Sequence, residues 1–143
     1  MNLQNAWTHR QISKKQAFGL SIVFIWFFIG GIMHFAATRI EASVVPPYIP
    51  WPMAAVLVSG AAELLGAAGI LIPRVRRAAG IGLFLLTVAV TPVHIYMLQR
   101  PELFHVPLWA LWLRLPIQLA LLWLIHWSTW RPRRQPAPLH SLR

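Results

Sequence analysis

The chain contains no cysteine and very few charged residues. Only 11% of its 143 residues are charged, whereas an ordinary soluble domain has about 25%. The lack of cysteine excludes structural disulfides, thiol redox relays, thiolate metal sites and cysteine nucleophiles. Any redox chemistry must therefore be carried by a bound cofactor or a quinone.

Acidic residues are especially scarce, with three Asp and Glu against thirteen Lys and Arg, so the formal net charge is +10. A basic chain can attract nucleic acid through the phosphate backbone. A nucleic-acid-binding surface, however, gathers its basic residues along one face or element. Here they form short clusters between long apolar runs. The sequence therefore predicts no nucleic-acid partner.

Apolar residues dominate what remains: 57% of the chain is hydrophobic, and the mean hydropathy is +0.58. A soluble chain this short could not bury so much apolar surface in one core. A helix needs about 20 apolar residues to cross the hydrocarbon layer, and four segments meet that length. We therefore expect an all-α fold, a four-helix transmembrane bundle. The expected helices are residues 17–38, 53–72, 78–98 and 108–127.

The first apolar run is longer than the 7–15 residues typical of a signal-peptide core. It is interpreted as a retained helix, with cleavage as the alternative. Residues 1–16 form a basic N-terminal segment, and residues 129–143 form a basic tail that is predicted to be disordered. The loop from Arg39 to Pro52 contains four prolines, which favour an extended or polyproline-like path. Pro92 and Pro116 are the candidates for helix kinks.

Orientation follows from the excess of Lys and Arg on the cytoplasmic side of membrane proteins. Only Arg39 and Arg100 lie near the ends that face the other side. The basic residues near the opposite helix ends are Arg10, Lys14, Lys15, Arg74, Arg76, Arg77, Arg131, Arg133 and Arg134. The sequence therefore predicts a multi-pass protein of the lipid bilayer with both termini in the cytoplasm.

Each expected helix carries a polar residue that is costly in lipid. These residues are His34, Glu63, His94, Arg114 and Gln118. A charged side chain at bilayer depth costs about 2.5–3.5 kcal/mol on insertion scales, so it normally faces the bundle interior. At 1.5 Å per residue, Arg114 lies about 9 Å and Glu63 about 15 Å below the start of its helix. His34 and His94 lie near the outer ends of theirs. The residues thus converge on one level and predict a polar pocket that opens outward.

Several roles are open to these residues. Glu63 and Arg114 could form a buried ion pair that sets the helix register. Alternatively, they line a pocket in which Glu63 exchanges a proton and Arg114 holds an anion or an oxygen atom. Two facing histidines, His34 and His94, could also ligate a haem. Their position near the interface and the lack of a haem-attachment sequence argue against haem, and no metal site is predicted.

Several short motifs together resemble the DoxX-like family of small four-helix membrane proteins. The resemblance covers roughly residues 17–128 and implies a four-helix bundle in the bacterial cytoplasmic (inner) membrane. Some members are associated with quinone-linked oxidoreductases, such as thiosulfate–quinone oxidoreductase. The positions that match the family pattern include the five polar residues above. The motifs are Gly31-Ile32-Met33-His34-Phe35, Val45-Pro46-Pro47-Tyr48-Ile49-Pro50, Ser59-Gly60-Ala61-Ala62-Glu63-Leu64, Thr91-Pro92-Val93-His94-Ile95-Tyr96-Met97 and Arg114-Leu115-Pro116-Ile117-Gln118.

The leading functional hypothesis is a quinone- or small-ligand-binding subunit of a membrane redox system. Its partners would be redox-enzyme subunits or further copies of the chain, and a quinone is the cofactor candidate. One alternative is a non-catalytic assembly or scaffold protein, in which the polar residues only hold the bundle together. A small-solute transporter and an isomerase acting on a lipid are further alternatives. The sequence leaves open whether the chain is an enzyme and which residues would be catalytic.

Overall fold

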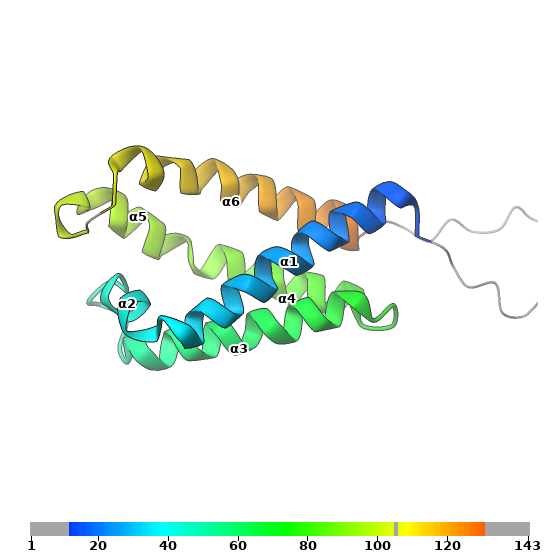
Figure 1. Ribbon diagram of the computed structural model, residues 1–143, viewed down its shortest axis with the longest axis horizontal. Helices are drawn as coiled ribbons and strands as arrows, with labels where there is room; N and C mark the ends of the chain where they lie inside the picture. Colours follow the sequence, from blue (N-terminus) through cyan, green and yellow to red (C-terminus); the bar gives the residue numbers. More distant parts are fainter. Residues whose placement is uncertain (1–11, 105, 131–143) are drawn as a thin grey trace, which may run out of the picture.

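The computed structural model describes residues 12–104 and 106–130, and within these ranges the chain is helical without strands (Figure 1). The helices are α1 (Lys14–Ala36), α2 (Thr38–Ser43), α3 (Pro52–Leu71), α4 (Arg76–Ala89), α5 (Thr91–Gln99), η2 (Pro101–Leu103) and α6 (Leu108–Thr129). Four stretches are long and apolar enough to cross a membrane: α1, α3, α4 with α5, and α6. The expected all-α architecture is therefore confirmed, with four helical stretches that are long and apolar enough to span a membrane.

Large apolar side chains cover the outside of the bundle. Phe18 is 70% exposed, Leu65 75% and Leu119 68%. Contiguous apolar surface of this kind is uncommon on monomeric soluble proteins. In a bilayer it faces hydrocarbon, while each helix satisfies its own backbone hydrogen bonds. The exposed side chains and the helix lengths agree on a multi-pass membrane protein.

Two glycines allow α1 and α3 to pack closely. A Cβ on Gly31 would lie 3.0 Å from the Gly60 carbonyl oxygen, and a Cβ on Gly60 would lie 2.7 Å from the Cβ of His34. Small residues at a helix interface let two backbones approach each other in a membrane. This contact places His34 directly beside α3.

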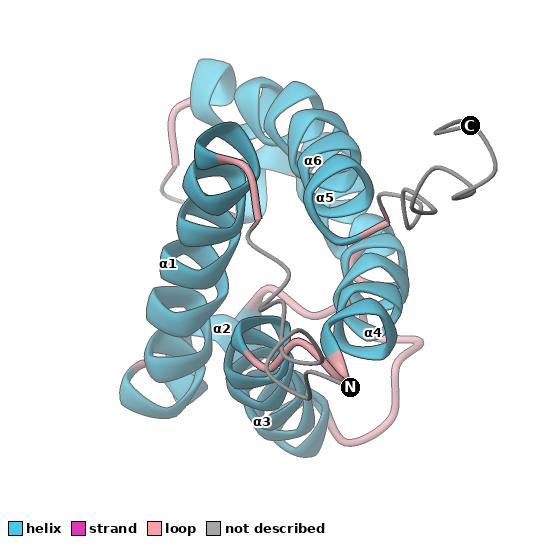
Figure 2. Cartoon of the chain, turned by 90° about the vertical axis from the view of Figure 1, so that its right-hand side faces the viewer, coloured by secondary structure: helices cyan, strands magenta, loops and turns pink. Residues whose placement is uncertain are grey.

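A hydrophobic core fills the half of the bundle where the described chain begins and ends. Leu20 and Val23 of α1 pack there with residues of α3, α4 and α6, among them Ile70 and Ile125. Gln16 Nε2 donates to the Ser128 carbonyl oxygen at 2.8 Å, which joins the start of α1 to the end of α6. In Figure 1 these two helices lie close together at this end and diverge toward α2 and α5. Figure 2 views the bundle from the end that carries the core.

The segment that follows α1 differs from the sequence expectation. Residues 38–43 form helix α2, and residues 44–51 run through turns, with the Ile49 amide donating to the Pro46 carbonyl oxygen at 3.0 Å. The extended path expected for this loop is therefore wrong. Its first part is a helix that packs against α3, and the prolines that follow lie in turns. Trp51 adopts a left-handed φ of 55° just before Pro52 begins α3.

The third spanning segment is interrupted, and the helix ends shift slightly from those expected. Val90 separates α4 from α5, and Pro92 lies in the first turn of α5, where its missing donor costs least. The break therefore lies next to Pro92, one of the two candidates for a kink. The other candidate, Pro116, lies inside an uninterrupted α6. Helix α1 starts at Lys14, within the expected N-terminal segment. Residues 1–11 and the tail 131–143 lie outside the described residues.

Candidate functional site

The half of the bundle opposite the core contains a partly open cavity of about 750 Å³. This volume lies within the 300–1,000 Å³ typical of small-molecule sites. Its lining comes from all six α-helices and is mainly apolar, as such sites usually are. The polar residues that line it are His34, Glu41, Ser59, Glu63, Thr87, His94, Arg114 and Gln118. All five residues singled out from membrane depth thus lie around one cavity.

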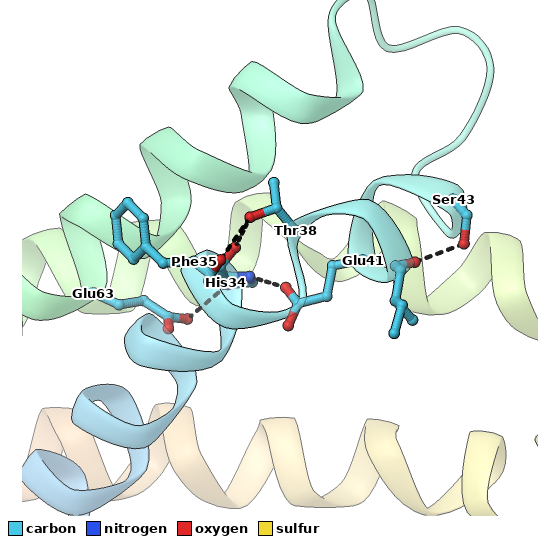
Figure 3. Close-up of polar contacts among 7 residues, drawn as sticks. His34, Phe35, Thr38, Glu41, Ser43 and Glu63 are labelled. Carbon is cyan, nitrogen blue, oxygen red and sulfur yellow. Dashed lines mark hydrogen bonds and ion pairs between the residues drawn. The ribbon is translucent and has the colours of Figure 1, made fainter.

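On one wall, His34 lies between two carboxylates (Figure 3). Its Nδ1 pairs with Glu41 Oε2 of α2, and its Nε2 lies 3.6 Å from Glu63 Oε1 of α3. The second distance is longer than a hydrogen bond and marks a close approach. The side chains are 21% exposed for His34, 26% for Glu41 and 14% for Glu63. Three helices therefore bring two acids to one imidazole.

The break between α1 and α2 brings Glu41 to His34. Ala37 has a non-helical backbone, with φ −120° and ψ 25°. Thr38 Oγ1 donates to the carbonyl oxygens of His34 at 2.7 Å and Phe35 at 3.0 Å, across this break. In an unbroken helix, Glu41 would lie about 10 Å further along the axis than His34. The bend instead returns its carboxylate to the ring, a contact that the sequence expectation missed.

The carboxylate of Glu63 fits against Gly30 of α1. A Cβ on Gly30 would lie 2.7 Å from Glu63 Oε2, so a side chain at this position would displace the carboxylate. Oε2 is buried and has no hydrogen-bond partner among the described residues. Of the two alternatives for Glu63 and Arg114, the direct ion pair is not formed among the described residues, because the close helix α1 brings His34 to Glu63 instead.

On the opposite wall, both the nitrogen and the oxygen of the Gln118 side-chain amide bond α6 to α4 and α5. Its Nε2 donates to the Thr87 carbonyl oxygen at 2.5 Å and to Thr91 Oγ1 at 2.7 Å. Its Oε1 lies 2.5 Å from His94 Nδ1. A carbonyl oxygen can only accept, so the nitrogen of the amide must face Thr87. Gln118 therefore positions His94 and has little capacity left for a ligand.

This orientation also determines the state of the neutral His94 ring. Because Gln118 Oε1 can only accept, His94 Nδ1 must carry the proton, which leaves Nε2 as an acceptor. Arg114 lies one turn before Gln118 on α6 and lines the same cavity as His94. Its guanidinium has no hydrogen bond or ion pair within residues 12–104 and 106–130. This wall therefore offers one acceptor, His94 Nε2, and one strong donor, Arg114.

These contacts bear on the haem and metal alternatives. Both ring nitrogens of His34 face carboxylates, so haem ligation would require that ring to leave its partners. Among the described residues, no group of three or more His, Cys, Asp or Glu is arranged to hold a metal ion. The arrangement instead suits proton exchange and hydrogen bonding to a small organic ligand.

Comparisons with known proteins match the chain to one family. A family model described as a domain of unknown function, DUF8561, matches residues 23–131. The match includes α1 from Val23 onward and all later helices, so it covers every residue that lines the cavity. No curated protein and no solved structure matches the chain.

Proposed function

The chain belongs to the DUF8561 family, and we propose that it binds a quinone, or a similar small ring compound with oxygen substituents, in its intramembrane cavity. It would act as the ligand-binding subunit of a membrane redox system. The observation that carries the proposal is the pair of polar walls in an otherwise apolar cavity. A quinone head group is a flat apolar ring with oxygen atoms at two opposite edges. It needs polar groups at two opposite sides and apolar contacts between them.

Each wall has a distinct chemical role in this proposal. Arg114 donates a hydrogen bond to a carbonyl oxygen of the oxidised ring. His94 Nε2, held as an acceptor by Gln118, takes a hydrogen bond from the hydroxyl group of the reduced ring. On the other side, Glu63 exchanges a proton with the second oxygen, with His34 as its neighbour. Leu86 and Ile117 belong to the apolar lining that would contact the ring.

The cellular setting is part of the proposal and rests on the sequence. The excess of Lys and Arg at one end supports a cytoplasmic position for both termini. The resemblance to the DoxX-like family supports the bacterial inner membrane and a partner among quinone-linked oxidoreductases. The cavity lies at the end of the bundle away from the described chain ends, so in this orientation it belongs to the outer half of the bilayer.

Titration with decylubiquinone tests the proposal. The full-length protein in nanodiscs should show saturable quenching of tryptophan fluorescence, because Trp26 lines the cavity. Glu63→Gln and Arg114→Leu should weaken binding by about tenfold or more, equivalent to about 1.4 kcal/mol. Glu102→Gln and Arg100→Leu are matched controls, because these residues pair with each other outside the cavity.

Two results would contradict quinone binding. One is the absence of saturable quenching in the wild-type protein. The other is equal affinity in all four variants and the wild type. If Glu63→Gln lowers the melting temperature while the affinity stays unchanged, the scaffold alternative is favoured instead.

The interruption at Val90 favours transport of a small solute as a second candidate. Broken helices often line substrate sites in transporters, and Val90 and His94 both line this cavity. This candidate predicts exchange of a radiolabelled benzoate across liposomes that contain the protein. Flux equal to that of empty liposomes would remove it for this anion class, of which Arg114 is the expected ligand.

A further inference from the structure

The arrangement of Glu41, His34 and Glu63 forms a continuous chain from the buried carboxylate to the end of the bundle. Glu63 is the least exposed of the three, His34 is intermediate and Glu41 is the most exposed. Glu41 lies on α2, the short helix that follows the outer end of α1. The three residues thus form a path from the cavity interior toward the α2 end of the protein (Figure 3).

Glu63 is largely shielded from bulk water in this arrangement. One oxygen, Oε2, is buried without a hydrogen-bond partner among the residues described and packs against Gly30. The other, Oε1, faces His34 Nε2 at 3.6 Å. The His34 ring is therefore placed to pass a proton between Glu63 and Glu41. A ligand that fills the cavity makes this path more important, because it displaces water from the space that Glu63 borders.

Histidine is suited to this position because its two ring nitrogens can exchange roles. Nδ1 faces Glu41, and Nε2 faces Glu63. Each carboxylate is therefore matched to a different nitrogen of one ring. A simple ion pair would need only one carboxylate beside His34. The presence of a carboxylate at each ring nitrogen is what distinguishes this arrangement.

We propose that Glu41, His34 and Glu63 form a proton relay between the cavity and the water at the α2 end. The inference rests on the proposed ligand-binding function, for which it supplies the path of the proton. In the outward step, protonated Glu63 gives its proton to His34 Nε2, and His34 gives its Nδ1 proton to the Glu41 carboxylate. Glu63 becomes charged, Glu41 becomes neutral, and His34 changes tautomer without a change in charge. Glu41 then releases the proton to water, and the reverse sequence carries one inward.

No other ionisable residue that lines the cavity lies between Glu63 and Glu41 in the described part of the chain. The other ionisable residues that line the cavity are His94 on α5 and Arg114 on α6. Both belong to the opposite wall, so neither lies in the chain of contacts between Glu63 and Glu41. Thr38 holds the bend that keeps Glu41 against the ring, through its bond to the His34 carbonyl oxygen.

A pH jump followed by rapid-mixing infrared spectroscopy tests the relay. The carboxyl band of Glu63 is assigned by its loss in Glu63→Gln, and its response is timed in full-length protein in nanodiscs. The measurement is made without ligand and with saturating decylubiquinone. Glu41→Gln and His34→Gln should slow the Glu63 response by about 10²-fold in both conditions, as expected when an acid–base group is removed from a transfer path. Glu102→Gln is the control. It removes an acid that lies at the same end of the bundle but outside the cavity, so the rate of the Glu63 response should stay unchanged.

Equal rates in the wild type and both relay variants would overturn the relay. Two variants are used so that misfolding of one does not decide the result: Glu41 is on α2 and His34 is on α1. In both variants the new glutamine can still form hydrogen bonds through its amide. Failure of the proposed function gives a different result. If the wild-type protein binds no decylubiquinone, quinone binding is contradicted. The relay is then tested by the rates of the Glu63 response in the wild type and the two variants without ligand. Normal binding by Glu41→Gln together with a slow Glu63 response supports both.

Discussion

Replacement of Gln118 by leucine should destabilise the bundle by about 2 kcal/mol. The substitution removes three contacts from one buried side chain: those to the Thr87 carbonyl oxygen, Thr91 Oγ1 and His94 Nδ1. Hydrogen bonds inside a membrane protein contribute on average about 0.6 kcal/mol each, so their joint loss gives about 2 kcal/mol. A much larger loss is not expected, because the Thr87 carbonyl oxygen keeps the hydroxyl of Thr91 as a donor at 3.3 Å.

The measurement is unfolding by SDS in mixed micelles, followed by circular dichroism. Gln99→Leu is the matched control, because Gln99 is exposed at the end of α5 and makes no side-chain hydrogen bond within the described residues. Gln118→Leu should unfold at lower SDS than the wild type, whereas Gln99→Leu should not. It should also weaken binding of decylubiquinol, because the His94 ring is no longer held with Nε2 as the acceptor. Identical unfolding of both variants and the wild type would refute the assigned role of Gln118.

Two further predictions concern the Glu63 contact and the orientation. Gly30→Ala should displace the Glu63 carboxylate, because the new Cβ would lie 2.7 Å from Oε2, and should weaken decylubiquinone binding by about tenfold, equivalent to about 1.4 kcal/mol. Gly82→Ala, with no atom within 4 Å of its Cβ, should leave the affinity unchanged; equal affinity of the two variants would contradict the contact. The absence of native cysteine allows single-cysteine labelling of intact cells: Ser43→Cys should react with an impermeant maleimide, and Arg74→Cys only after permeabilisation. The reverse pattern would contradict the proposed cytoplasmic termini.

The spanning helices could be predicted because lipid imposes a simple length requirement. Each of the four needs about 20 apolar residues, and no other part of the chain supplies them. The same physics identified His34, Glu63, His94, Arg114 and Gln118, because polar groups in hydrocarbon are too costly to leave unpartnered. The structure brings all five to one cavity.

The partners of these residues could not be predicted in the same way. Depth along a helix is readable from sequence, but the rotation of one helix against another is not. The close contact at Gly31 and Gly60 turns His34 toward α3, so Glu63 meets His34 and not Arg114. Gln118, expected to face a ligand, is held instead by the Thr87 carbonyl oxygen.

Glu41 and helix α2 were missed for a different reason. The segment is short and stands before a run of prolines, so its local pattern resembles a loop. Its helix is accompanied by contacts with residues outside the segment, namely Glu41 with His34 of α1 and α2 with α3. One signal was available: Glu41 is one of only three acidic residues in the chain, and an acid close to a membrane-embedded histidine is a natural partner for it.

Native mass spectrometry of the protein purified in mild detergent is the sharpest test of ligand binding in the cavity. The wild type and Arg100→Leu should carry a small apolar ring compound with oxygen substituents at up to one molecule per chain. Arg114→Leu should lose it, because Arg114 is a cavity-lining donor that has no partner within residues 12–104 and 106–130. A wild-type protein that carries only phospholipid, at the same level as Arg114→Leu, would contradict the account.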